Sequence, residues 1–206
     1  MFRKFSAIFV LFSLLFIADY AFSTKLKSTW KNPSATPESF QFKNVLVVVA
    51  IKQPLTRKVA EDEAVRQVQA GGRAQAVASY TLLTNDDLDN KEAAKAKVAD
   101  KGFDGAILIR YVESADERKY DPDAYNEWNS YNNFWWTFGG TYNALNPSDT
   151  KVYIETMLYS LKDEKLIWSG ITETRNPKNP AVVVEEIAKE TTKYLQKEGL
   201  IPNKKK

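Results

Sequence analysis

Residues 45–51 read VLVVVAI, and this run decides the fold class. Continuous apolar and mostly β-branched residues are typical of a strand that is buried on both faces. A sheet that contains such a strand needs covering helices on both of its sides. The run therefore predicts an α/β domain.

The segments that follow this run alternate between helix and strand patterns. Pro54 suits the first turn of a helix that Gly71 and Gly72 end, and GAILIRYV at residues 105–112 is again almost wholly apolar. Right-handed crossovers join such units, so the order predicts parallel neighbouring strands. The predicted strands are residues 45–51, 74–80 and 105–112, and the predicted helices are residues 54–70 and a segment that ends at Gly102.

The remaining elements predict a mixed sheet. Residues 151–161 and 165–174 alternate with period two around a polar KDEK tip, which predicts an antiparallel hairpin. Asn179 can cap a last helix that runs to Lys197. The fold class is thus α/β, a two-layer or three-layer sandwich of order β-α-β-α-β, then a hairpin and a C-terminal helix. The residues expected to be buried are Val47, Val49, Ile107, Ile109, Ile154 and Trp168.

The N-terminus has the pattern of a secretory signal peptide. Arg3 and Lys4 precede an apolar run at residues 5–18, and Ala21 and Ser23 offer small residues before a cut at Thr24. The run reaches about 21 Å as a helix, which is short of a bilayer core of about 30 Å. An uncleaved anchor is the alternative. We expect export to the periplasm of a Gram-negative bacterium, with the protein associated with the envelope.

The composition excludes several classes of chemistry. The chain has no His and no Cys, which removes disulfides, thiolate nucleophiles, lipidation at a cysteine, Ser-His-Asp triads and most transition-metal sites. A net charge of +3 does not indicate nucleic-acid binding. Asp86, Asp87 and Asp89 lack the glycine and the glutamate of an EF-hand loop. We expect no enzyme activity, no cofactor and no metal.

An aromatic-rich insert at residues 114–149 is the most unusual stretch. Residues 120–142 hold nine aromatic residues and no Lys or Arg. Three interpretations remain open: packing against the sheet, recognition of a protein or a glycan, and peripheral contact with a membrane interface. The aromatic residues expected to bind a partner are Tyr131, Phe134, Trp135, Trp136 and Phe138.

Charged residues interrupt the apolar strands at Arg110, Glu155 and Glu173. One interpretation is that each faces solvent or lies at a strand end. The other is a buried Arg110–Glu155 ion pair, because a charge inside a strand needs a partner. A glycosidase-type pair formed by Glu155 and Glu173 is a third, weaker hypothesis. Arg57, Glu61 and Asp62 have helical spacing and are expected on a solvated face.

Several segments resemble a family of bacterial envelope proteins of unknown function, many of which are lipoproteins. The most specific segments are ADKGFDGAIL at residues 99–108 and ETMLYSLKDEKLIW at residues 155–168. The fold is also similar to the N-terminal domain of TolB and to CsgG, a likeness that implies no function. The family has lipidated members, whereas this chain lacks the cysteine, and the resemblance implies no catalytic residues.

These observations predict a non-enzymatic binding or assembly module of the envelope. A cell-wall glycan binder that uses the insert is the alternative, and a carboxylate-dependent carbohydrate-active enzyme is the weakest. The partner would be an envelope protein or a glycan, and the oligomeric state is left open. The expected organisation is a signal peptide at 1–23, an edge strand and loop at 24–43, one α/β domain at 44–201 and a basic tail at 202–206.

Overall fold

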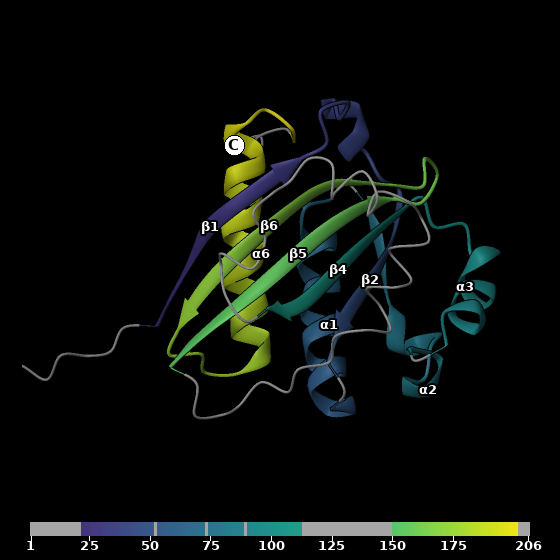
Figure 1. Cartoon of the computed structure of the whole chain (residues 1–206), viewed down its shortest axis with the longest axis horizontal. Coiled ribbons are helices and arrows are strands. Elements are labelled where there is room, and N and C mark those ends of the chain that lie inside the picture. Colours follow the sequence, from purple (N-terminus) through teal and green to yellow (C-terminus); the bar gives the residue numbers. More distant parts are fainter. Residues whose placement is uncertain (1–21, 52, 73, 89, 113–149, 202–206) are drawn as a thin grey trace, which may run out of the picture.

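The computed structural model describes residues 22–51, 53–72, 74–88, 90–112 and 150–201. Their strands form one six-stranded mixed sheet in the order β1-β6-β5-β4-β2-β3 (Figure 1). The strands are β1 (Ser23–Lys31), β2 (Asn44–Ala50), β3 (Gln75–Ala78), β4 (Gly105–Val112), β5 (Lys151–Ser160) and β6 (Lys165–Arg175). The helices are α1 (Pro54–Ala70), α2 (Asn85–Leu88), α3 (Lys91–Ala99) and α6 (Pro180–Lys197), with single 3₁₀ turns at Pro37–Phe40 and Ser79–Thr81.

The sheet joins a parallel half to an antiparallel half at β4. β2 pairs in parallel with β3 and β4, whereas β4, β5, β6 and β1 pair antiparallel in that order. The predicted parallel strands, the hairpin and the N-terminal edge strand are thereby confirmed. The predicted strand at 74–80 is shorter than expected, because Ser79 already begins a 3₁₀ turn.

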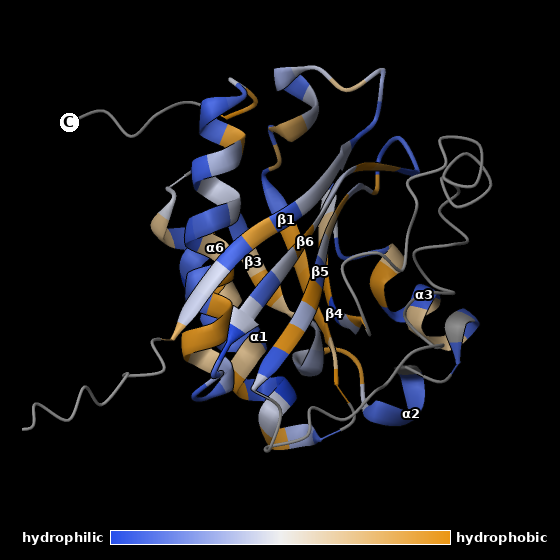
Figure 2. Ribbon diagram, turned by 60° about the vertical axis from the view of Figure 1, so that its left-hand side comes forward, coloured by the Kyte–Doolittle hydropathy of each residue, from blue (hydrophilic) through white to orange (hydrophobic). Residues whose placement is uncertain are grey.

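Helices cover both faces of the sheet, which confirms the predicted α/β sandwich. Figure 2 shows α1 and α6 on one side of the sheet and α2 and α3 on the other. Val45, Val47 and Val49 pack into the core on the α1 and α6 side, whereas Leu46 and Val48 pack with α3. Each face of β2 is therefore buried, which explains the continuous apolar run at residues 45–51.

The ends of α6 follow from local sequence. The Asn179 side chain accepts a hydrogen bond from the Val182 amide at 3.0 Å, with Pro180 at the first helical position. Gly199 adopts a φ of 68°, and the Leu200 amide donates to the Leu195 carbonyl at 2.9 Å. These features form a Schellman motif, in which a glycine with positive φ ends the helix.

Most of the predicted core residues are buried. Five of the six have exposures of at most 6%, whereas Ile107 is only partly buried. On α1, the apolar side chain of Leu55 is 75% exposed. It lies in the first turn of the helix, next to Pro54, where the helix contributes other positions to the core.

Candidate functional site

The polar group at the centre of the sheet is built by β4, β5 and β6. Arg110 and Glu155 lie opposite each other across β4 and β5. Arg110 Nε and Nη2 each lie 2.8 Å from Glu155 Oε2, and Ser169 Oγ donates to Glu155 Oε1 at 2.8 Å. Arg110 is 7% exposed and Glu155 is fully buried. The structure thus has the buried ion pair, and the interpretation that these charges face solvent is wrong.

Glu173 lies on the same face as Glu155 and is also buried. It accepts hydrogen bonds from Arg175 Nε at 2.8 Å and from the Tyr153 hydroxyl at 3.1 Å. The hydrogen bond from Arg175, helped by that from Tyr153 and opposed by burial, lowers the pKa of Glu173 below its usual value. The carboxyl is therefore ionised near neutral pH.

The two acids do not have the environment of a glycosidase pair. Such a pair needs one carboxylic acid whose pKa is raised and that reaches the substrate. Glu155 is fully buried and holds Arg110 and Ser169, while the pKa of Glu173 is shifted in the opposite direction. Their chemistry is that of structural ion pairs, which fix the register of the strands because a slip by one residue would separate the charges.

This polar group lies near the two strand ends that flank the aromatic-rich insert in the sequence. Val112, the last residue of β4, pairs with Tyr153 near the start of β5, two positions along from the Arg110–Glu155 pair. The strands that precede and follow residues 113–149 in the sequence are therefore adjacent in the middle of the sheet. The residues predicted to bind a partner, Tyr131, Phe134, Trp135, Trp136 and Phe138, lie outside the described residues.

A second buried charge network overturns the prediction of a solvated face on α1. Arg57 is 2% exposed and Glu61 is fully buried, whereas Asp62 is exposed as expected. Glu61 Oε1 accepts from Arg57 Nε at 2.9 Å, from Ser79 Oγ at 2.7 Å and from the Val49 amide at 3.1 Å. Its Oε2 accepts from the Tyr80 amide at 2.9 Å.

Hydrogen bonds of this network connect α1, α2, β2 and the 3₁₀ turn at Ser79–Thr81, at the carboxyl ends of β2 and β3. Arg57 also donates to Ser79 Oγ at 2.8 Å and to Asn85 Oδ1 at 3.1 Å. Open α/β sheets usually bind ligands at this edge. Here the groups are engaged with one another, so the network serves structure. The i, i+4 spacing of Arg57 and Glu61 predicts the pair, but spacing alone does not show which way the pair faces.

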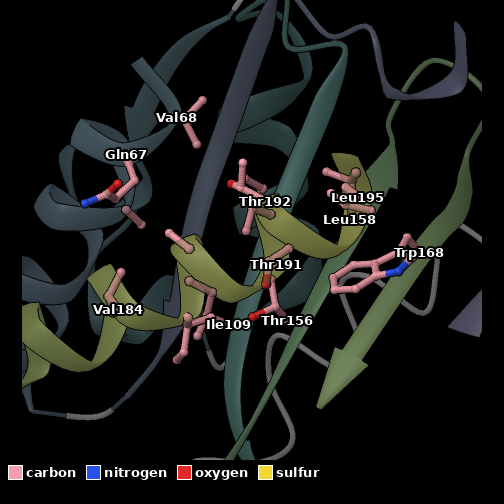
Figure 3. A pocket seen from close by; sticks show the side chains of 14 residues that line it. Gln67, Val68, Ile109, Thr156, Leu158, Trp168, Val184, Thr191, Thr192 and Leu195 are labelled. Atoms are coloured by element: carbon pink, nitrogen blue, oxygen red, sulfur yellow. The ribbon is translucent and has the colours of Figure 1, made fainter. Parts of the chain in front are cut away.

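A cavity of about 170 Å³ lies between α1, α6 and the sheet, and no sequence pattern marks it. Figure 3 shows its lining: Gln67 and Val68 come from α1, Val184, Thr191, Thr192 and Leu195 from α6, and Ile109, Thr156, Leu158 and Trp168 from the strands. The lining is largely apolar. Gln67 is partly exposed and Thr192 is exposed, so the opening lies between the two helices.

Two absences concern the described residues only: a metal-binding cluster and a membrane-spanning helix. No group of three or more His, Cys, Asp or Glu side chains in this part of the chain could hold a metal ion. None of the described helices is long and apolar enough to cross a membrane.

The chain was compared with known proteins. No protein-family model and no curated protein matches it. It is similar to two solved structures from Paraburkholderia phytofirmans. The first is a PelC dodecamer with 12% identity and a TM-score of 0.43, covering 84% of this chain and 96% of that one. The second is a dodecamer of a PelC variant with 14% identity and a TM-score of 0.41, covering 82% and 96%. These values are too low to assign a family or a function.

Proposed function

We propose that the protein is a non-enzymatic binding or assembly module of the bacterial envelope, and that the aromatic residues between 120 and 142 form its contact surface. The observation that carries this proposal is the adjacency of the two strands that flank residues 113–149 in the sequence. These strands, β4 and β5, pair with each other in the middle of a six-stranded sheet. Loops that a rigid scaffold positions in this way commonly carry recognition.

The surroundings of the anchor support a binding role over a catalytic one. Glu155 and Glu173 lie near the end of β5 that adjoins the segment in the sequence, and both are buried and engaged in ion pairs. Aromatic side chains supply flat apolar area at low entropic cost, and the interleaved Asn residues supply adaptable hydrogen bonds. This composition suits an envelope protein or a glycan as the partner.

The start of the fold supports the proposed export. β1 begins at Ser23, directly beside the predicted cleavage site before Thr24. A cut there leaves the pairing of β1 with β6 from Thr24 onward intact. The expected product in cells has Thr24 as its first residue, which the mass of the protein purified from the periplasm will show.

Co-sedimentation tests the proposed contact surface. The purified protein is mixed with peptidoglycan sacculi and, separately, with outer-membrane vesicles, beside a Trp135→Ala/Trp136→Ala variant. A Leu55→Ala variant is the control, because Leu55 is an exposed apolar side chain on α1. We expect the protein and the control to pellet with one of the two materials and the double variant to stay in solution. Equal pelleting of all three proteins, or of none, would contradict the proposal.

Pelleting with sacculi would favour the glycan-binding form of the proposal. Pelleting with vesicles would favour an envelope protein or the membrane interface, which protein-free lipid vesicles then separate. In either outcome the loss in the double variant identifies the segment that makes the contact.

A further inference from the structure

The cavity between α1, α6 and the sheet contains polar atoms that the fold leaves unpaired. Thr156 Oγ1, Trp168 Nε1 and Thr191 Oγ1 are the buried side-chain atoms without a hydrogen-bond partner among the described residues. All three side chains line this one cavity. Thr156 is 8% exposed and Trp168 is 1% exposed. Figure 3 places both threonines in the middle of the lining, with a carbon edge of the Trp168 ring toward them and its nitrogen on the far side of the ring.

Unpaired atoms of this kind are rare and costly. Most buried polar groups in native proteins have a partner, and each exception costs roughly 1–3 kcal/mol. Threonine and valine have nearly the same shape, so valine at positions 156 and 191 would avoid this cost. The convergence of three exceptions on one cavity points to a molecule that supplies the missing hydrogen bonds.

The lining defines the chemistry of that molecule. Ile109, Leu158, Ile187 and Leu195 give it apolar walls, and the set of described lining residues contains no charged side chain. A charged group would lose its hydration there without a counter-charge. A threonine hydroxyl can donate or accept, so one oxygen atom on the molecule can pair with Thr156 Oγ1 or Thr191 Oγ1.

The size of the cavity limits the molecule further. A dry apolar cavity of about 150 Å³ in another protein holds benzene, and the cavity here is slightly larger at about 170 Å³. We propose that it binds a small neutral molecule, or a small neutral moiety of a larger one, with a hydrocarbon body of about six to eight non-hydrogen atoms and one oxygen.

Gly170 has a specific part in shaping the site. A Cβ atom at this position would lie 2.3 Å from Trp168 Cη2 and 2.6 Å from Cζ2. The six-membered part of the indole therefore rests against the glycine backbone, two residues along the same strand. The glycine lets the ring lie along β6 as a wall of the cavity, while α6 supplies Thr191 from the opposite side.

The test is a titration followed at the Trp168 indole N–H. The chain has five Trp residues, so ¹H–¹⁵N spectra resolve few indole signals, and Trp168→Phe identifies the relevant one. The probes are phenol and toluene, which have nearly equal size and differ in that phenol carries a hydroxyl group where toluene carries a methyl group. We expect phenol to shift the Trp168 signal saturably, and to bind about three- to tenfold more weakly in Thr156→Val and in Thr191→Val, the effect of one lost hydrogen bond.

Two controls make the result decisive. Toluene should bind Thr156→Val and Thr191→Val at least as well as it binds the original protein. Thr150→Val, at an exposed position outside the described cavity lining, should leave phenol binding unchanged. A folded protein whose Trp168 signal does not respond to phenol would overturn the proposal and assign the polar atoms to water. If the affinity for phenol were unchanged in both Thr156→Val and Thr191→Val, the assigned hydrogen bonds would be wrong.

None of the described residues that line the cavity belongs to the proposed contact surface. The cavity is formed by α1, α6 and the sheet face on which these helices pack, whereas Arg110 and Glu155, near the strand ends that flank residues 113–149, lie on the α3 side. Either proposal can fail without the other.

Discussion

Replacing Glu61 by alanine should destabilise the protein strongly. The carboxylate accepts four hydrogen bonds, from the Arg57 guanidinium, the Ser79 hydroxyl and the amides of Val49 and Tyr80. Its removal leaves the Arg57 charge at 2% exposure without its counter-charge, and it leaves two backbone donors without this acceptor. The substitution therefore breaks a buried pair on one side only.

The magnitude follows from this geometry. Removing one partner of a buried ion pair typically costs about 3–5 kcal/mol. A single domain has a free energy of unfolding of about 5–15 kcal/mol, so the loss is a large fraction of the total. With a urea dependence of about 2–3 kcal/mol per M, the unfolding midpoint should fall by about 1–2.5 M.

Urea unfolding followed by far-UV circular dichroism measures this shift. Asp62→Ala is the matched control, because Asp62 is the next residue of α1 and pairs with Lys58 in solvent. Exposed ion pairs contribute little, so the control should move the midpoint much less. If the midpoint of Glu61→Ala fell no further than that of the Asp62→Ala control, the assigned role of the network would be refuted.

Three further substitutions test particular contacts. Thr156→Val removes an unpaired buried hydroxyl and should raise the free energy of unfolding by about 1 kcal/mol, whereas a loss would mean that the hydroxyl has a partner. Gly170→Ala places a Cβ against the Trp168 ring and should cost about 1–3 kcal/mol, and an unchanged melting temperature would show that the ring lies elsewhere. Glu173→Gln tests the lowered pKa: the folded state holds this proton more weakly than the unfolded chain, so the stabilisation exists above the ordinary carboxyl pKa of 4.5 and is lost as the pH falls through the lower folded value. The variant should therefore lose less stability on acidification below about pH 5, and an identical pH profile would exclude this role.

The sequence predicted most of the fold because its patterns are local. The apolar run at 45–51, the alternation at 151–161 and the cap at Asn179 each follow from contacts within a few residues or from burial of a whole face. The parallel direction of β2, β3 and β4 then follows from the alternation of strands and helices, which right-handed crossovers connect.

The direction of single polar side chains could not be predicted in the same way. Arg57 and Glu61 have the spacing of an exposed helical pair, and only the position of α1 over the end of β2 shows that they face inward. Arg110 and Glu155 became a candidate pair because both interrupt apolar strands, but only the register of β4 and β5 places them opposite each other.

The cavity was beyond prediction because it depends on packing between distant elements. Thr156, Trp168 and Thr191 belong to β5, β6 and α6, and their sequence neighbours do not mark them. Apolar periodicity shows which face of an element is buried, but it does not show whether the buried side chains fill the space between two elements.

The melting temperature of the Trp135→Ala/Trp136→Ala variant tests most directly whether the aromatic segment is a contact surface. Trp168→Ala serves as the reference for a core tryptophan, because Trp168 is 1% exposed. Losing such a side chain costs about 3–5 kcal/mol, which in a domain of this size lowers the melting temperature by about 6–20 °C. We predict that the double variant melts within about 3 °C of the unsubstituted protein while it no longer pellets with its envelope target. A decrease as large as that of Trp168→Ala would contradict the proposal and place Trp135 and Trp136 in the core.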